Sequence, residues 1–353
     1  MTFDRDTAAL EGLEELLLGD RPTLTRLEVA ERAGVPIEEA AHLWHLLGFP
    51  GTADDDVAFT DADVRALRHT RALVDLGILD RNREDGLVRT WGRSFARLAE
   101  WQVTLLTEVA TELGVDLSEG IAALSEEVLP RVEELQVIVW KRHLLGAWSR
   151  VMVGSDDTGT RRAVCFVDIV GYTSRSKTLT ERELVSWLEA FESAALDTVL
   201  AHDGRIIKNI GDELLVVADT AEHATAIAME LTRRGEDPDD PFPSVRAGVA
   251  YGDVVLRLGD VFGPVVNVAS RLTSVARPGS VLVDEGTYAA LTGRPHPEEG
   301  ADHNGDHNGE HNGDHNGDHE DTDDHDAPYR FRRLRRLSVK GYPRLKAWSV
   351  RPR

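Results

Sequence analysis

The spacing of apolar residues divides the chain into two parts with different periods. In the first part apolar residues recur at steps of three and four, as at Leu98, Trp101 and Leu105, which is the period of an amphipathic helix. Beyond residue 160, short apolar runs alternate with helix-like segments. This pattern predicts an α+β chain with an all-α domain over 1–125, a coupling helix and linker over 126–159, and an α/β domain over 160–353.

Capping signals and apolar runs predict individual elements. Thr60, three residues before Asp63, predicts a helix that runs through Leu76, and Thr180 with Glu183 predicts a helix that runs to His202. The apolar runs that predict strands of the second domain are 163–167, 204–208, 214–218, 244–251 and 280–283.

Acidic residues are concentrated in one segment of the chain. The net charge is −22, but the stretch from residue 295 to 326 contains twelve Asp or Glu and no Lys or Arg, so the rest of the chain carries about −10. Within it an acid-His-Asn-Gly repeat with no apolar residues predicts a disordered insert over 295–327. Its histidines, His303 to His319, suit a weak metal-binding or pH-responsive tract, but a tolerated surface-loop insertion is the favoured interpretation.

Composition also limits location and partners. No apolar run approaches the roughly 20 residues of a membrane span, and the polar start does not resemble a secretory signal, so we expect a soluble cytoplasmic protein. The acidic balance argues against nucleic acid as a partner. The single cysteine, Cys165, lies in a strand-like run and is expected to be a small buried apolar residue.

Two acidic residues stand where predicted strands end. Asp168 closes an apolar run that turns through Gly171, and Asp212 lies at or near the tip of a predicted hairpin in Lys208-Asn-Ile-Gly-Asp-Glu213. Two such carboxylates can hold a pair of hard divalent cations, Mg²⁺ or Mn²⁺, and paired metals clamp the oxygens of a phosphoryl displacement. Taken singly, each is equally compatible with an aspartate that caps a turn.

A third segment, Gly259-Asp-Val-Phe-Gly-Pro-Val-Val-Asn-Val-Ala-Ser-Arg271, predicts a helix that starts at Pro264 and carries Asn267 and Arg271 on one face. Together the three segments resemble the catalytic domain of class III nucleotidyl cyclases, over about residues 160 to 353 without the acidic insert. The tail from Leu337 to Trp348 is similar to the last hairpin of that family. The resemblance implies a ferredoxin-like catalytic domain that dimerises.

The resemblance also implies roles for particular residues. Asp168 and Asp212 would bind two metal ions, with the Ile169 carbonyl as a further ligand, and Lys208 and Asp260 would read the base. Asn267 would orient the ribose, Arg271 would stabilise charge at the α-phosphate, and Lys340 is a candidate for the terminal phosphates, although a surface lysine is the simpler interpretation. In this family metal ligands come from one subunit and base-reading residues from the other, which implies a homodimer.

The preferred nucleotide base can be inferred from the hydrogen-bonding groups of Lys208 and Asp260. Adenine offers an acceptor at N1 and a donor at its amino group, so a lysine donor and an aspartate acceptor complement it, whereas guanine offers the reverse pattern. Lys208 and Asp260 therefore favour ATP over GTP. The expected reaction is attack of the ribose 3′-hydroxyl on the α-phosphorus to give cyclic AMP and pyrophosphate.

The N-terminal half has competing interpretations. Residues 25–49 have the rhythm of a helix-turn-helix, so the alternative function is a DNA-binding regulator with an inactive cyclase-like domain. The would-be recognition helix, however, carries Glu38 and Glu39 and no Lys or Arg. A diguanylate cyclase is a further alternative, because Ile210-Gly-Asp-Glu-Leu214 is similar to its signature motif. However, Ile210 replaces a glycine, and that family has no helix that carries residues like Asn267 and Arg271.

The chain as a whole resembles actinobacterial cyclases with a helical N-terminal domain, among them a pH-sensing type. That resemblance implies that the N-terminal half restrains catalysis at neutral or alkaline pH and releases it in acid. Histidine changes charge in that range, so the titrating candidates are His42, His45, His69 and His143.

Overall fold

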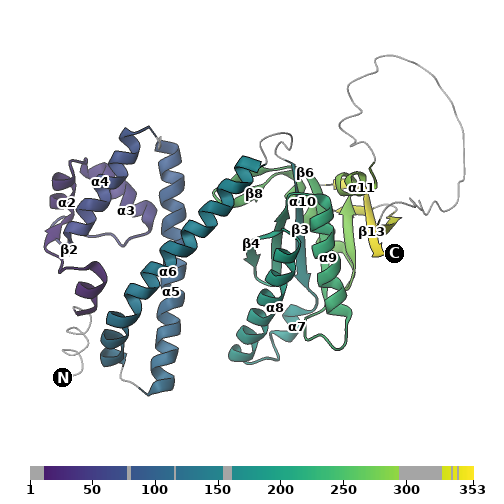
Figure 1. Ribbon diagram of the computed structural model, residues 1–353, viewed down its shortest axis with the longest axis horizontal. Coiled ribbons are helices and arrows are strands. Elements are labelled where there is room, and N and C mark those ends of the chain that lie inside the picture. Colours follow the sequence, from purple (N-terminus) through teal and green to yellow (C-terminus); the bar gives the residue numbers. More distant parts are fainter. Residues whose placement is uncertain are drawn as a thin grey trace, which may run out of the picture. The chain divides into compact units, whose positions relative to one another are not determined.

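The structure is a computed structural model in which the chain forms two compact units, Met1–Ser155 and Asp156–Arg353, here called the N-terminal and C-terminal units (Figure 1). The residues that the structure describes are 12–77, 81–114, 117–153, 161–293, 328–334, 337–339 and 342–353. The acidic repeat lies outside these residues. None of the described helices is both long enough and apolar enough to cross a membrane.

The N-terminal unit is helical, with one small two-stranded sheet in which β1 pairs antiparallel with β2. Its elements in chain order are β1 (Leu24–Thr25), α2 (Arg26–Ala33), α3 (Ile37–Leu47), β2 (Val57–Phe59), α4 (Asp61–Asp75), α5 (Arg81–Leu113) and α6 (Leu117–Val153). The helix predicted after Thr60 is confirmed as α4. The predicted division at residue 125 falls inside α6, because this helix continues without a break from Leu117.

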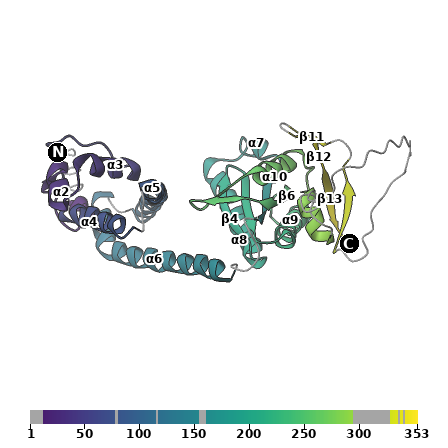
Figure 2. The same ribbon diagram turned by 90° about the horizontal axis from the view of Figure 1, so that it is seen from above.

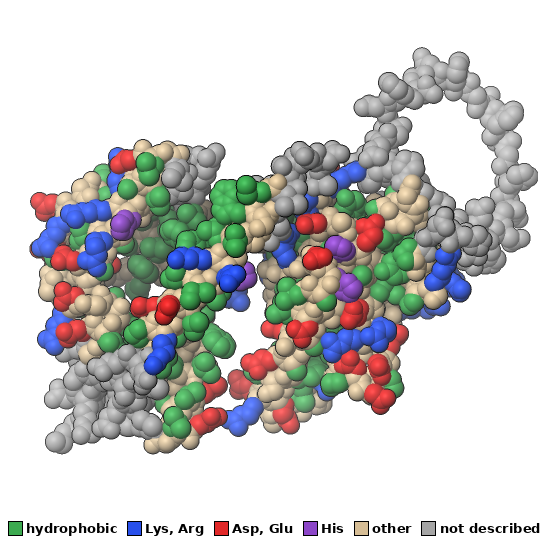
Figure 3. Space-filling view, viewed as in Figure 1, with side chains coloured by type: hydrophobic (Ala, Val, Ile, Leu, Met, Phe, Trp, Pro, Cys, Tyr) green, Lys and Arg blue, Asp and Glu red, His purple; other side chains and the backbone are tan. Residues whose placement is uncertain are grey.

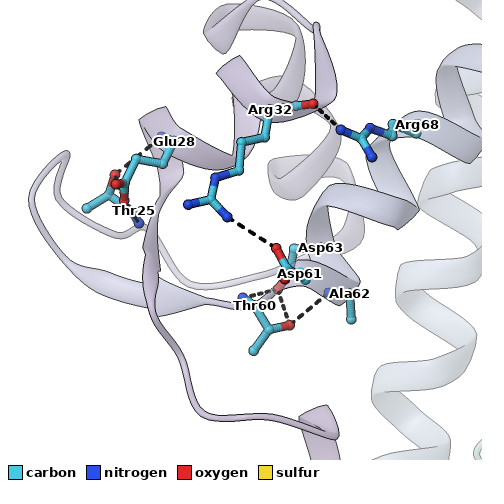
Figure 4. A network of polar contacts seen from close by, with 8 residues as sticks. All are labelled: Thr25, Glu28, Arg32, Thr60, Asp61, Ala62, Asp63 and Arg68. Atoms are coloured by element: carbon cyan, nitrogen blue, oxygen red, sulfur yellow. Dashed lines mark hydrogen bonds and ion pairs between the residues drawn. The ribbon is translucent and has the colours of Figure 1, made fainter.

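Helices α2, α3 and α4 pack as a helix-turn-helix with the β1–β2 pair beside it, around a core that includes Val29, Leu43 and Trp44. Capping boxes start α2 at Thr25 and α4 at Thr60. In each, the threonine hydroxyl accepts from an amide of the first turn, and the carboxylate three residues later accepts from the threonine amide. Figure 4 shows both caps, and it shows two arginine contacts that join the last turn of α2 to α4. Arg32 pairs with Asp61 at 3.3 Å, and Arg68 donates to the Arg32 carbonyl at 2.5 Å.

The C-terminal unit contains a seven-stranded sheet in the order β10-β13-β9-β6-β3-β5-β4, in which only β6 and β9 run parallel. Two small hairpins, β7–β8 and β11–β12, stand apart from it. The strands are β3 (Arg161–Ile169), β4 (Arg205–Ile210), β5 (Glu213–Ala218), β6 (Val245–Asp253), β7 (Val255–Arg257), β8 (Asp260–Phe262), β9 (Val281–Asp284), β10 (Tyr329–Arg333), β11 (Leu337–Val339), β12 (Tyr342–Leu345) and β13 (Ala347–Pro352). The helices are α7 (Tyr172–Arg175), α8 (Glu181–Ala201), α9 (Ala221–Glu236), α10 (Pro264–Val275) and α11 (Glu285–Thr292).

Helices cover both faces of this sheet, and Figure 2 shows α8 and α9 on one side with α10 on the other. Side chains alternate along a strand, so β3 serves both layers. Cys165 and Val167 pack toward α8, α9 and α11, whereas Val164 and Phe166 pack toward α10. The side chain that follows in this second series is Asp168, which therefore lies on the α10 face.

The five strands predicted from apolar runs are confirmed as β3, β4, β5, β6 and β9, and the helix predicted from Thr180 is confirmed as α8. Cys165 is fully buried as expected, and burial raises the pKa of its thiol to about 12. The mixed sheet behind a helical region confirms the α+β class. The short hairpin β7–β8 has no counterpart in the predicted strands, because each of its strands has only 3 residues.

Candidate active site

Asp168 lies at the C-terminal end of β3, between two strands that each place a charged residue opposite it. The register pairs Asp168 with Glu213 of β5 and with Arg246 of β6. The Arg246 guanidinium donates from Nε to Asp168 Oδ2 at 2.7 Å, and its Nη2 lies 2.7 Å from the same oxygen. A third nitrogen, Nη1, donates to the Ser274 carbonyl of α10 at 3.2 Å. These contacts hold the carboxylate in one orientation at the sheet end.

Asp212 belongs to the two-residue connection between β4 and β5. The chain reverses there through Gly211, whose positive φ of 66° is a conformation that glycine adopts without strain. The Ile169 amide donates to the Asp212 carbonyl at 3.2 Å, so the hairpin tip is tied to the residue that follows Asp168. The structure therefore brings Asp168, Ile169 and Asp212 together, three residues that the sequence analysis grouped as metal ligands.

The three carboxyl groups of this cluster repel one another. Burial is the main cause that raises the pKa of Asp212, and the charge of Asp168 adds to it. Burial and the charges of Asp168 and Asp212 raise the pKa of Glu213 to about 7. Arg246 is the cation that acts against both shifts. The negative charge of the three carboxylates therefore exceeds the single positive charge that Arg246 supplies.

A divalent cation would supply that charge. Oxygen ligands are the set that Mg²⁺ and Mn²⁺ prefer, and Mg²⁺ is usually held by one or two carboxylates together with substrate phosphates and water. Asp168, Asp212 and the Ile169 carbonyl fit such a partial set. No group of three or more His, Cys, Asp or Glu within the described ranges has the arrangement of a complete protein cage for a metal.

Lys208 and Asp260 come from β4 and from the β7–β8 hairpin, 52 positions apart in sequence, and they meet in space. Lys208 Nζ donates to Asp260 Oδ2 at 2.5 Å, and Asp260 Oδ1 accepts from the Val261 amide at 2.8 Å. Both side chains are partly exposed. A donor and an acceptor are therefore held side by side at an accessible edge, as the hydrogen-bonding pattern of adenine requires.

Asn267 and Arg271 are exposed on α10, four positions apart, as the sequence predicts. The helix begins at Pro264 and lies very close to the sheet, because β6 carries a glycine at the crossing. A Cβ at Gly248 would stand 2.5 Å from the Ala269 carbonyl oxygen and 2.5 Å from the Thr273 amide nitrogen. The height of α10 above the sheet is thus set by Gly248.

The described contacts join Asp168 to Arg246 and join Lys208 to Asp260. Among the contacts that the structure gives for the described residues, none joins Lys208 or Asp260 to Asp168 or Asp212. Lys340 falls outside the described residues. Glu213 and Arg246 were missed by sequence reasoning, although each had a signal: Glu213 adjoins Asp212, and Arg246 is a lone cation in the apolar run 244–251.

Comparison with known proteins agrees with this arrangement. Residues 158–312 match the family described as "Adenylate and Guanylate cyclase catalytic domain". An adenylate cyclase of Streptomyces coelicolor is 40% identical over 278 residues, covering 77% of this chain and 72% of that protein. The chain belongs to the class III adenylate cyclases.

Two other relatives extend the likeness across both units. An adenylate cyclase of Glutamicibacter nicotianae is 38% identical over 311 residues, with 81% of this chain and 76% of the relative covered. A protein of Mycobacterium tuberculosis named pH-sensitive adenylate cyclase is 32% identical over 295 residues, with 79% and 73% covered. Family membership confirms the enzyme class, adenylate cyclase with a helical N-terminal region, and it disfavours the diguanylate cyclase interpretation.

Proposed function

We propose that this adenylate cyclase converts ATP to 3′,5′-cyclic AMP and pyrophosphate at sites formed between two copies of the chain. The observation that supports this best is the meeting of Asp168 and Asp212 at adjacent strand ends, where burial and mutual repulsion raise the pKa of Asp212. A site with excess negative charge suits divalent cations and the phosphates that they carry.

The cations, two Mg²⁺ or Mn²⁺ per site, would activate the ribose 3′-hydroxyl and neutralise charge on the phosphates. Asp168, Asp212 and the Ile169 carbonyl would hold them. Arg246 keeps the Asp168 carboxylate oriented through its contact at 2.7 Å, and it brings a positive charge to the carboxylate cluster. Asn267 would orient the ribose and Arg271 would stabilise charge that develops at the α-phosphorus. Lys340 remains a candidate for the terminal phosphates.

Lys208 and Asp260 would select the base. In the free chain they satisfy each other, so adenine would replace one charged hydrogen bond with two bonds to its N1 and amino group. Guanine would set donor against donor and acceptor against acceptor, leaving polar groups unpaired. ATP is therefore the expected substrate.

The family resemblance implies a homodimer with two equivalent sites, and no described contact joins the Lys208–Asp260 pair to Asp168 or Asp212 within one chain. Mixing two inactive variants tests this. Asp168→Ala lacks a metal ligand and Arg271→Ala lacks the charge at the α-phosphorus, so each dimer alone should be inactive. In random mixtures half the dimers would hold one intact site, and the mixture should regain about a quarter of wild-type activity.

Cyclic AMP formation by the mixture would show sites shared between chains. Persistent inactivity of the mixture, with both variants folded and dimeric, would contradict the shared site. GTP in place of ATP serves as the substrate control, and the wild-type chain with Mg²⁺ or Mn²⁺ removed by a chelator serves as the metal control.

We further propose that the N-terminal unit regulates catalysis in response to pH, a property named in one relative that is 32% identical. Of the four histidines considered, His42 has a carboxylate partner: its Nε2 lies 3.0 Å from Asp85 Oδ1 and so links α3 to α5. Protonation in acid would turn this contact into an ion pair.

The measurement is cyclic AMP production from pH 5 to 8 by the wild type, by His42→Gln and by the matched control His45→Gln, which alters a histidine on the same helix. A flattened profile in His42→Gln with an unchanged profile in His45→Gln supports the proposal. Identical profiles in all three proteins would remove His42 from the mechanism.

DNA binding is not favoured as the role of the helix-turn-helix. The second helix, α3, carries Glu38 and Glu39 in its first turn, and Glu39 lies 3.8 Å from Arg71 of α4. Acidic side chains at the end that would enter the major groove oppose the phosphate contacts on which such binding depends.

A further inference from the structure

A single turn of helix, α7, follows directly after the candidate metal ligands at the end of β3. Ile169 is the last residue of β3, and α7 begins three residues later at Tyr172. Its N-cap residue is Gly171, with a φ of 75°, so no side chain caps the turn. One helical turn is not stable by itself, because the first turn fixes several residues for a single hydrogen bond. Contacts from other parts of the fold must therefore hold α7 in place.

Trp187 of α8 supplies two such contacts. The Tyr172 ring stacks on the Trp187 ring, with the ring centroids 6.2 Å apart and the planes inclined by 12°. The Arg175 guanidinium carbon lies 4.7 Å from the centroid of the same ring. Tyr172 and Arg175 are three positions apart and so share one side of the turn. Stacked rings and a cation over an indole ring both attract, so this side of α7 is fixed to Trp187.

Trp187 is fixed in turn by the packing of α8. Figure 3 shows acidic side chains over the outer surface of this helix, where Glu189 and Asp197 are exposed. On the inner side Trp187 packs against the core cluster that contains Phe191 and Ala195. Its Nε1 is buried and has no hydrogen-bond partner among the described residues. An unpaired buried N–H lowers stability, so it is the ring that Trp187 contributes at this position.

The other end of the connection is tied to the sheet. The Ile169 amide donates to the Asp212 carbonyl at 3.2 Å, and the Val170 amide donates to the Ser244 carbonyl at 2.9 Å. The peptide units between Ile169 and Tyr172 therefore run from a fixed sheet end to a turn that is held by Trp187. A peptide carbonyl turns with the dihedral angles on both sides of it, so it keeps one direction only when both sides are fixed.

We propose that Trp187 is a positioning residue for the metal site: its ring fixes α7, and α7 fixes the direction of the Ile169 carbonyl beside Asp168 and Asp212. This role rests on the proposed function, in which that carbonyl and the two carboxylates hold the cations. Groups that orient metal ligands set the affinity for the metal without touching it.

Hydrogen exchange of the metal-free, full-length chain tests the first step. The Ser174 and Ser176 amides donate within α7, to the Gly171 and Tyr172 carbonyls. Peptides over residues 170–178 should exchange about tenfold faster in Trp187→Leu, because the turn loses its support. Trp187→Phe keeps an aromatic ring at this position and should exchange like the wild type. Unchanged exchange in Trp187→Leu would overturn the proposal.

Binding of Mn²⁺ alone, measured from the EPR signal of the free ion, tests the second step. Trp187→Leu should weaken binding about fivefold, less than the loss of a direct partner of a ligand would, and Trp187→Phe should restore it. In the activity assay the half-saturating Mn²⁺ concentration should rise by the same factor, while kcat at saturating Mn²⁺ stays within about twofold of wild type.

Val199→Ala is the matched control for a loss of packing alone. Val199 is fully buried and lies on the same helix, 12 positions beyond Trp187. The cavity left by this substitution should lower the melting temperature and leave Mn²⁺ binding unaltered. An equal loss of Mn²⁺ binding in Val199→Ala, or binding of wild-type strength in Trp187→Leu, would contradict the positioning role.

Asp212→Ala separates the positioning role from the proposed function. Weak Mn²⁺ binding in Asp212→Ala with wild-type binding in Trp187→Leu would retain the metal site and reject the role of Trp187. Binding of wild-type strength in Asp212→Ala would reject the metal site itself, and the positioning role with it.

Discussion

The two units differ in how far they bury their apolar side chains. In the C-terminal unit the central strands β3, β5 and β6 are buried on both faces, and residues such as Val164 and Val217 are wholly inaccessible. In the N-terminal unit the long helices leave large side chains in solvent, with Phe95 55% exposed and Trp101 59% exposed on α5. The C-terminal unit completes its own core, whereas α5 and α6 have more apolar surface than the unit can cover.

The two units also differ in where they place their charged residues. The C-terminal unit draws three carboxyl groups and Arg246 to one end of its sheet, where burial raises two of the pKa values. The N-terminal unit uses its charges at helix caps and surface pairs, such as Arg32 with Asp61. Groups with perturbed pKa values gather at functional sites. This difference therefore favours the C-terminal unit as the place of the chemistry.

The largest expected effect is a loss of catalytic rate without a loss of stability. Asp212→Ala should lower the rate of cyclic AMP formation by about a hundred- to a thousandfold, because the site loses one of its two metal-binding carboxylates. The melting temperature should not fall, since removing Asp212 also relieves repulsion. Asp197→Asn, on the exposed surface of α8, is the matched control and should keep full activity. Substantial activity in Asp212→Ala would dissociate the carboxylate cluster from catalysis.

The next effect concerns the choice of base. Lys208→Gln should reduce the preference for ATP over GTP by about a hundredfold, because the charged donor to adenine N1 is lost. The ratio of kcat/KM for the two nucleotides measures this, and the change should fall mainly on ATP. A ratio equal to that of the wild type would show that Lys208 and Asp260 pair only with each other.

Two glycines test the comparison of the units directly. A Cβ at Gly248 would meet the α10 backbone at 2.5 Å, and a Cβ at Gly92 in α5 would meet the Leu47 carbonyl oxygen at 2.5 Å. Each alanine substitution should cost about 1–3 kcal/mol of stability in its own unit. Gly248→Ala should also lower activity by displacing α10.

Thermal unfolding and activity together measure this pair of effects. Gly252→Ala is the control, because its Cβ would meet only a Val265 side-chain atom at 3.1 Å. Equal losses of activity in Gly92→Ala and Gly248→Ala would mean that the two units do not differ in how directly they support the site.

The smallest effect is a pH dependence of stability in the C-terminal unit. Burial raises the pKa of Asp284, which caps α11 and accepts from the Thr287 amide at 2.8 Å. Because the folded-state pKa lies above the unfolded value, the folded protein binds more protons, and stability falls as pH rises through that interval. Asp284→Asn should therefore gain a few degrees in melting temperature relative to wild type at pH 8, and less at pH 4. A constant difference across this range would contradict a raised pKa.

Much of the C-terminal unit could be predicted, because its signals are local. Buried strands appear as short apolar runs, and a carboxylate at the end of such a run, as at Asp168, stands out against it. The pairing of Lys208 with Asp260 was expected only through the family resemblance, because 52 positions separate the two residues. The β7–β8 hairpin that presents Asp260 has strands of 3 residues each, too short to stand out as apolar runs.

The amino-acid sequence by itself determined the order of elements, the change of period near residue 160 and the acids of the site, since propensity and patterning act over a few neighbours. Tertiary structure alone decided that Arg246 faces Asp168 across β3 and β6, because strand register is a property of the assembled sheet. It likewise decided which part of α6 lies beside α5 and which part extends away from it. Sequence shows that a helix is apolar on one side, but only packing shows whether anything covers that side.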